Sequence, residues 1–184
     1  WSSFAQTFDD LWSDDKAFRH MSNRIGDNLV HFGGNESLVR ALNAAGVRFL
    51  IVGGLAMAWY CPARIADDMD LLIEPTPENA AKVAQAFNRL GLVGLSENSF
   101  VRPGLQVALK DATFYAELLT PKDGGMAYAE AEASSVDARL FNIPVRVASV
   151  EALIGMKAHA AASTAGVERQ KHLDDISLLR GVPP

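Results

Sequence analysis

The chain has one cysteine in 184 residues, Cys61, so an internal disulfide and a multi-cysteine metal site are both excluded. A chain that uses so little cysteine suits a reducing compartment, and we expect a cytoplasmic protein. No apolar run approaches the roughly 20 residues that a membrane-spanning helix needs. Residues 1–20 also lack the basic and then apolar order that is typical of a signal peptide. We therefore expect no association with a membrane.

An excess of positive charge is also missing. The chain carries 17 lysine and arginine residues against 22 aspartate and glutamate residues, and its net charge is −5 at pH 7. Nonspecific binding to nucleic acid depends on many phosphate contacts from basic side chains. The net charge therefore does not favour broad binding of this kind, although it is compatible with a local basic patch.

Linkers rich in proline, glycine or serine are absent, and so are internal repeats. The composition, 49% hydrophobic and 21% charged, is that of an ordinary globular protein and argues against disorder. The length suits one domain with a small appendage. We interpret residues 1–34 as an N-terminal arm and residues 35–184 as the main domain, which includes helices at the C-terminus.

The apolar pattern predicts strands and helices in a mixed order. Strand-like segments lie at residues 47–54, 68–74, 99–104, 105–110, 113–120 and 139–149. Helical segments lie at residues 36–46, 55–61, 75–91, 150–163 and 169–180. Asn35, the last residue of a predicted loop at residues 31–35, and Thr76 suit the N-caps of two of these helices. The order implies an α+β or α/β fold, with helices on the faces of a sheet of about five strands. Of the two we predict α+β, with a mixed sheet and a helical C-terminal tail.

Acidic residues gather at the start of one apolar strand. Asp68 and Asp70 should point to one side of that strand and Met69 to the other, because successive side chains alternate. Two carboxylates on one side suit Mg²⁺, which takes carboxylates together with water and substrate phosphates. Glu117 interrupts another apolar strand, and it completes a metal site if the two strands are neighbours. A solvated acidic surface remains the alternative.

Two glycines precede this cluster. Gly53 and Gly54 end one strand and open a helix, where free backbone N–H groups attract phosphate. A pair of glycines after a strand can also be no more than a tight turn. The strand, the Gly-Gly pair, the short helix, the Asp-x-Asp motif and the later acid are more specific together than any one of them alone.

The segment VGGLAMAWYCPARIADDMDLLI resembles the nucleotidyltransferase signature of the DNA polymerase β superfamily. The resemblance implies metal-dependent transfer of a nucleoside monophosphate from a nucleoside triphosphate to an acceptor hydroxyl. It implies that Asp68, Asp70 and Glu117 bind Mg²⁺, as one ion or two. Glu117 would also help to deprotonate the acceptor, and Gly53 and Gly54 would accommodate the triphosphate.

The C-terminal segments SVEALIGMKAHAA and RQKHLDDISLL resemble the tail of AbiEii-like minimal nucleotidyltransferases. This implies that Lys157 neutralises phosphate charge and that Asp175 orients the lysine or the sugar. His172 departs from the pattern, since it stands where the tail motif usually has an aspartate. A solvated helix lysine is the alternative for Lys157. Arg64 is expected either to contact phosphate or to neutralise the neighbouring aspartates.

The resemblance ranks the possible functions. The first is transfer of a nucleotide to RNA, such as tRNA, or to a protein, in a bacterial toxin–antitoxin or phage-defence setting with an antitoxin as partner. The second is transfer to a small molecule such as an aminoglycoside or lincosamide antibiotic. The third is a module that binds a nucleotide or a partner protein without turnover.

Overall fold

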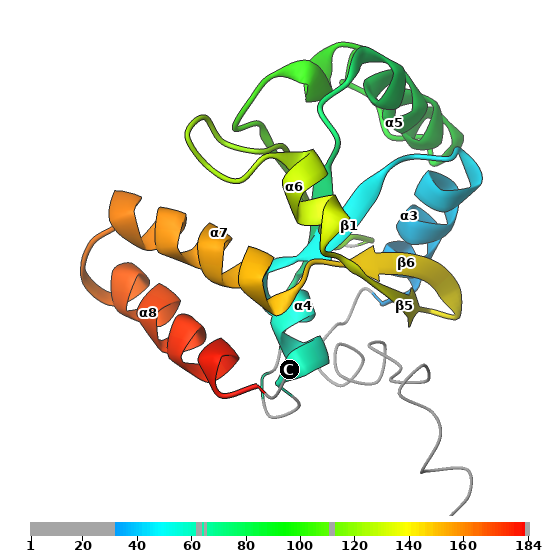
Figure 1. Ribbon diagram of the computed structural model, residues 1–184. Helices are drawn as coiled ribbons and strands as arrows, with labels where there is room; N and C mark the ends of the chain where they lie inside the picture. The colour runs from blue at the N-terminus through cyan, green and yellow to red at the C-terminus, as the bar shows by residue number, and fades with distance from the viewer. Residues whose placement is uncertain (1–31, 62–63, 65, 111–112, 183–184) are drawn as a thin grey trace, which may run out of the picture.

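The computed structural model describes residues 32–61, 64, 66–110 and 113–182 (Figure 1). The predicted N-terminal arm, residues 1–34, lies outside the described residues except for its last three positions. No helix in the described part of the chain combines the length and the apolar character that crossing a bilayer requires.

The centre of the fold is a six-stranded mixed sheet with the order β3-β4-β2-β1-β6-β5. The strands are β1 Phe49–Val52, β2 Met69–Ile73, β3 Gln106–Lys110, β4 Tyr115–Leu119, β5 Val136–Leu140 and β6 Ile143–Val147. β2 pairs parallel with β4, and β1 pairs parallel with β6, whereas the other neighbours are antiparallel. The predicted α+β class and mixed sheet are confirmed, but the sheet has six strands rather than about five.

The single strand predicted at residues 139–149 is instead part of a hairpin of two strands, β5 and β6. Its turn consists of Phe141 and Asn142, whose φ angles are 53° and 62°. Two residues with positive φ are typical of the type I′ turn, whose twist matches that of paired strands. Asparagine adopts this conformation readily, but phenylalanine rarely does, and Phe141 is buried in the core. The predicted strand at residues 99–104 is also wrong, because Ser99–Val101 form a 3₁₀ helix, η2.

Six α-helices surround the sheet in the described part of the chain. They are α3 Phe32–Ala44, α4 Gly53–Tyr60, α5 Pro77–Arg89, α6 Tyr128–Ala133, α7 Val150–Ser163 and α8 Gly166–Arg180. Thr76 caps α5 as predicted, since its hydroxyl accepts a hydrogen bond from the Asn79 N–H at 3.3 Å. The short helix α6 was not predicted.

The predicted loop at residues 31–35 is wrong over most of its length, because α3 already begins at Phe32. Gly34 lies so close to the chain at Thr113 that a Cβ would come within 1.8 Å of the Thr113 carbonyl oxygen. Asn35 is fully buried, and instead of capping a helix its amide pairs with the backbone of Tyr115. Its Nδ2 donates to the Tyr115 carbonyl at 3.2 Å, and its Oδ1 accepts from the Tyr115 N–H at 2.9 Å. The glycine and the amide thus join α3 to the start of β4.

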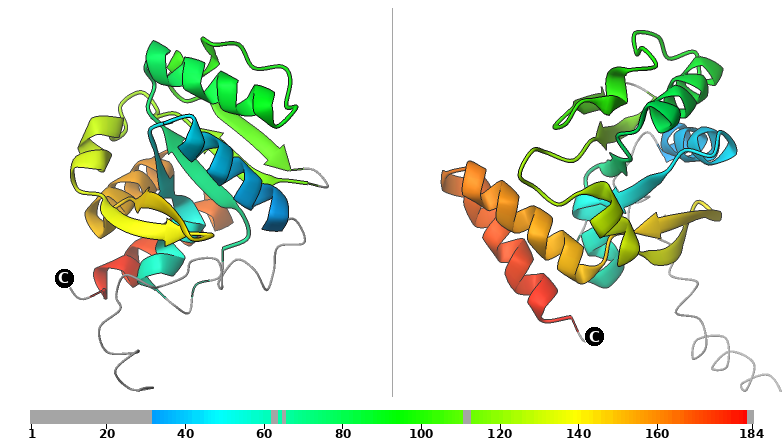
Figure 2. Two further views of the ribbon diagram at one scale, coloured as in Figure 1. Left: turned by 90° about the vertical axis from the view of Figure 1, so that its right-hand side faces the viewer. Right: turned by 45° about the horizontal axis from the view of Figure 1, so that its top comes forward.

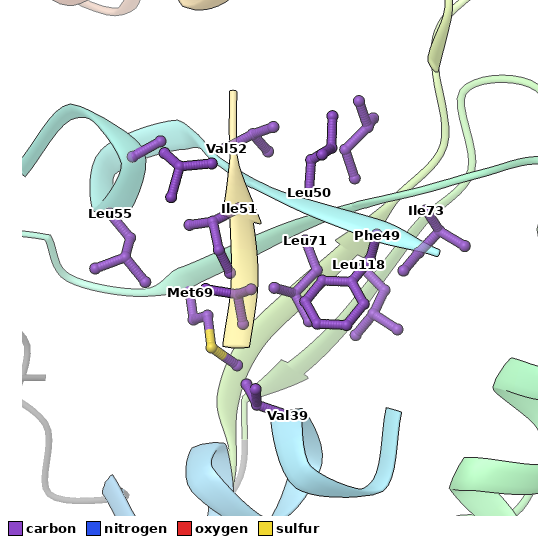
Figure 3. Packing of buried hydrophobic residues seen from close by; sticks show 14 of the residues in the cluster. Val39, Phe49, Leu50, Ile51, Val52, Leu55, Met69, Leu71, Ile73 and Leu118 are labelled. Atoms are coloured by element: carbon purple, nitrogen blue, oxygen red, sulfur yellow. The ribbon is translucent and has the colours of Figure 1, made fainter. Parts of the chain in front are cut away.

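The alternation of side chains divides the sheet into a core face and a second face. On the core face Ile51, Met69, Leu71 and Leu118 are fully buried and lie near Val39 of α3 (Figure 3). Helices α3 and α5 lie on this side of the sheet, and the α7–α8 hairpin lies on the other (Figures 1 and 2). The second face is therefore free to carry polar side chains toward α7 and α8.

Candidate active site

Three carboxylates converge on the second face of the sheet. β2 and β4 are parallel neighbours, and their register places Asp70 opposite Glu117. Asp68 directly precedes β2, and one ligand oxygen from each of the three residues lies within 4.8 Å of the others. The predicted convergence is confirmed, because the strand of Glu117 does neighbour that of Asp70. A hard cation such as Mg²⁺ prefers oxygen ligands of this kind, so the donor set fits a divalent metal.

These carboxylates line a cavity of about 500 Å³ between the sheet and the α7–α8 hairpin. The α7–α8 side of the cavity carries nitrogen-bearing side chains, namely Lys157, His159, Lys171 and His172, and Arg64 joins them through its ion pair with Asp175 of α8. Leu72 and Leu119 of the sheet and Leu153 and Met156 of α7 add apolar surface to the lining. The cavity therefore has an acidic side and a basic side, an arrangement that suits a polyanion carrying a metal ion.

The Asp70 carboxyl has an unusual acidity. Burial first, and then the negative charges of Asp68 and Glu117, raise its pKa to about 7, although Lys157 and the backbone N–H of Gly54 act in the opposite direction. Near neutral pH the Asp70 carboxyl is therefore protonated in some of the molecules and ionised in the others. A divalent cation in the cluster would favour the ionised form.

Glu117 is held by two side chains from the neighbouring strand. β3 pairs with β4 so that Ala108 faces Glu117, and Gln106 and Lys110 project on either side of that small residue. Gln106 Nε2 donates to one carboxylate oxygen of Glu117 at 2.8 Å, and Lys110 Nζ lies 2.8 Å from the other. Lys110 Nζ also lies 2.9 Å from Asp68 Oδ2. Hydrogen bonds to Glu117 and Asp68 raise the pKa of Lys110, so the ammonium stays charged.

Gln106 and Lys110 were missed by the sequence analysis. Alternation does place residues 106, 108 and 110 on one face of a strand, which the sequence could have indicated. The pairing of that strand with Glu117, and its register, are the information that only the fold supplies.

The predicted residues of the tail form a second cluster on the basic side. Lys157 Nζ lies 2.6 Å from Asp175 Oδ2, and Arg64 Nη2 lies 3.3 Å from Asp175 Oδ1. Asp175 is 2% exposed, so α8 presents a buried carboxylate to one cation from α7 and one from the segment before β2. This contact is the one expected of a residue that orients Lys157, whose role toward phosphate stays a prediction.

His172 lines the same cavity, next to this cluster. Its Nδ1 is buried and has no hydrogen-bond partner among the described residues, and its Nε2 lies 3.6 Å from Glu168 Oε1. Burial and the positive charge of Lys157 lower the pKa of His172. The imidazole is therefore neutral at physiological pH, and it has one nitrogen that donates a hydrogen bond and one that accepts. An ionised aspartate, the usual residue of the tail motif at this position, could only accept.

The two glycines that open α4 differ in their surroundings. Gly53 has a φ angle of +63°, and a Cβ built on it would come within 1.8 Å of Asp70 Oδ2. A Cβ on Gly54 would meet Ala66 at 3.7 Å, which is an ordinary contact. Both glycines line the cavity, and their role in accommodating phosphate stays a prediction. Gly53 has the further effect of leaving room for the Asp70 carboxylate.

Gly53→Ala is therefore expected to displace the Asp70 carboxylate and to weaken Mn²⁺ binding at least about tenfold, with a loss of stability of about 1–3 kcal/mol from the strained backbone. Gly54→Ala is the matched control, and it should bind Mn²⁺ within about twofold of the wild type. Calorimetric titration of the two variants tests the difference. Equal affinities would show that Gly53 is not needed for the position of Asp70.

No protein-family model and no curated protein matches the sequence. Solved structures do resemble it. One is an antigenic nucleotidyltransferase-like protein from Paracoccidioides brasiliensis, with 16% identity and a TM-score of 0.52 over 83% of this chain and 75% of that chain. Another is ANT(2")-Ia in complex with adenylyl-2"-tobramycin, with 23% identity and a TM-score of 0.52 over 78% of this chain and 84% of that chain.

The chain has the nucleotidyltransferase fold. This confirms the fold that the Gly-Gly and Asp-x-Asp segment predicts. At these identities the likeness establishes a nucleotidyltransferase fold alone, so the reaction and the acceptor have to be argued from the side chains of the cavity.

Proposed function

We propose that the protein transfers a nucleoside monophosphate from a nucleoside triphosphate to an acceptor hydroxyl in a Mg²⁺-dependent reaction. The observation that carries this proposal is the cavity in which Asp68, Asp70 and Glu117 face Lys157 and Arg64. The carboxylates complement the positive charge of a metal ion, and the basic side chains complement the negative charge of the triphosphate that carries it. The nucleotidyltransferase fold supports the same conclusion.

The chain contributes ligands, phosphate contacts and a base to this reaction. Asp68, Asp70 and Glu117 would hold Mg²⁺, which would neutralise phosphate charge and polarise the reacting oxygens. Gly53 and Gly54, at the N-terminus of α4, would contact the triphosphate through the backbone. Lys157, oriented by Asp175, would offset the negative charge of the phosphates, and Arg64 would supply a second positive charge beside it.

In the transfer step the acceptor oxygen forms a bond to the α-phosphorus while the bond from that phosphorus to the bridging oxygen of pyrophosphate breaks. The proton of the acceptor hydroxyl passes to the Glu117 carboxylate, and pyrophosphate leaves with the electron pair of the broken bond. Gln106, which holds one oxygen of Glu117 at 2.8 Å, would keep the carboxylate directed at the acceptor.

For the acceptor, we propose RNA such as tRNA, or a protein, ahead of a small molecule. Arg64, Lys157 and Lys171 line the cavity and complement a phosphate backbone in addition to the triphosphate. The resemblance of the tail to AbiEii-like proteins favours a toxin–antitoxin or phage-defence setting in a bacterium. The adenylyl-2"-tobramycin bound to ANT(2")-Ia supports the alternative of a small aminoglycoside acceptor. A module that binds nucleotide without turnover is the third possibility.

Thermal and urea unfolding with each of the four ribonucleoside triphosphates, with and without Mg²⁺, tests the proposal. One nucleotide should stabilise the wild type by about 2.7 kcal/mol at 100 times its dissociation constant, only when Mg²⁺ is present. Asp68→Asn should abolish this effect, whereas Asp67→Asn, one residue away and exposed, should retain it. If no nucleotide stabilises the wild type, or if Asp68→Asn responds equally, the carboxylates are not a metal–nucleotide site.

A further inference from the structure

Lys110 lies between two of the carboxylates that the proposed function assigns to the metal. Its Nζ is 2.9 Å from Asp68 Oδ2 and 2.8 Å from Glu117 Oε1. In the described part of the chain no ion pair of this lysine reaches Asp70. The ammonium thus bridges two members of the triad and forms no ion pair with the third.

We propose that Lys110 is a built-in counter-ion, which occupies the cation position between Asp68 and Glu117 and competes with a divalent metal for it. The proposal rests on the proposed function, in which these carboxylates bind Mg²⁺. Magnesium binds carboxylate oxygens at about 2.0–2.1 Å. An ammonium less than 3 Å from the same two oxygens would lie against the ion, and the two positive charges would repel each other strongly. Metal binding therefore requires the lysine to leave.

The position of Lys110 makes this departure possible. It is the last residue of β3, which is the edge strand of the sheet, and its side chain is 37% exposed. The side chain has a flexible four-carbon stem, and the ring of Tyr115, its partner in the strand register, lies 5.6 Å from Nζ. The ammonium can move to solvent beside this ring without a change in the backbone.

Glu117 does not depend on Lys110 for its position. When the lysine leaves, Gln106 Nε2 still donates to Glu117 Oε2, and β4 remains paired on both sides. The triad can therefore exchange one cation for another while its geometry stays in place. In the metal-free protein the lysine limits the repulsion among three carboxylates, and it raises the metal concentration at which the site fills.

The test is a titration of the full chain with Mn²⁺ alone, in which free Mn²⁺ is measured by electron paramagnetic resonance and no nucleotide is present. Lys110→Met and Lys110→Gln should bind Mn²⁺ about tenfold more tightly than the wild type, because partly exposed ion pairs contribute modestly. Lys110→Arg keeps the charge and should bind no more tightly than the wild type. Circular dichroism establishes that each variant is folded.

Lys122→Met is the control for the loss of a positive charge near the site. Lys122 lines the same cavity and takes part in no ion pair among the described residues, so its removal should change Mn²⁺ affinity by less than about twofold. Asp68→Asn should lose Mn²⁺ binding, and this loss would establish that the measured Mn²⁺ binds at the carboxylates.

If Asp68→Asn loses binding but Lys110→Met and Lys110→Gln bind Mn²⁺ no more tightly than the wild type, the competition is overturned and the proposed function stands. If Lys122→Met gains as much affinity as Lys110→Met, net charge explains the effect and the competition is again overturned. If the wild type has no Mn²⁺ site that Asp68→Asn removes, both the competition and the proposed function fail.

Discussion

Asp70→Asn is expected to make the metal-free protein more stable at pH 8 and to reduce Mg²⁺-dependent turnover more than about 100-fold. The two effects have one cause. The carboxylate is buried beside Asp68 and Glu117, so its ionised form is unfavourable in the folded protein until a cation is bound. Asparagine removes this cost, but it also removes a metal ligand. Loss of a residue that only supports a ligand already lowers metal affinity or activity 10- to 100-fold.

The pH dependence of the stability follows from the same shift. The pKa of Asp70 rises from 3.8 in an unperturbed chain to about 7 in the folded one, so between these values the folded state binds more protons than the unfolded state. The stabilising contribution of Asp70 to the free energy of unfolding is therefore fully present below about pH 4 and is lost as the pH rises to about 7. A pKa difference of one unit corresponds to about 1.4 kcal/mol, so a difference of about three units sets the gain of the variant at pH 8 on the order of 4 kcal/mol.

Urea unfolding in EDTA at pH 4.5 and pH 8 measures the stability difference, which should be small at the lower pH and large at the higher one. Pyrophosphate release, with tRNA and with tobramycin as acceptors, measures turnover. Asp67→Asn is the matched control, since Asp67 is exposed and should alter neither quantity by much. A variant that is no more stable than the wild type at pH 8 would show that Asp70 ionises freely in the folded protein.

The acidic half of the site could be predicted from the sequence because each of its signals is local. An Asp-x-Asp pair at the start of an apolar strand places two carboxylates on one face of that strand by alternation, and an acid inside another apolar strand identifies the third candidate. The sequence could not supply the pairing of β2 with β4 or the register that places Asp70 opposite Glu117, and the structure shows both.

The parts of the structure that could not be predicted depend on the register between strands, or on residues that depart from their usual local conformation. Lys110 lies beside Glu117 only because Ala108 is the residue that faces it, and a shift of one position would turn the lysine to the other face. The β5–β6 turn places a buried phenylalanine at positive φ, where tertiary packing overrides the local preference. Asn35 suits a helix cap, but its amide pairs with the backbone of a strand 80 residues away.

Asp175→Ala should lower the free energy of unfolding by about 3–5 kcal/mol, the usual cost of removing one partner from a buried ion pair. Asp175 is 2% exposed and accepts contacts from Lys157 and Arg64, so its loss leaves a largely buried ammonium without its carboxylate. The cluster also joins α8 to α7 and to the segment before β2, so the contacts among these elements should loosen together.

Asp174→Ala is the matched control for this substitution. Asp174 is the preceding residue on the same helix, is exposed, and accepts a hydrogen bond from Gln170 at 2.8 Å. Its removal should change stability by less than about 0.5 kcal/mol, as surface substitutions usually do. Urea unfolding of the two variants measures the contrast, and equal losses would show that the buried pair has no special role in stability.

A double variant separates the structural role of this pair from its role toward phosphate. Replacing both partners of a buried ion pair with apolar residues is often neutral for stability, so Lys157→Met with Asp175→Leu should recover most of what Asp175→Ala loses. If Lys157 contacts the triphosphate, the recovered fold will still bind nucleotide at least about tenfold more weakly than the wild type, because a charge-assisted contact has been removed. Nucleotide affinity equal to that of the wild type would make the pair a structural feature of the α7–α8 hairpin, and Arg64 and Lys171 would then be the cations available to the phosphates on that wall.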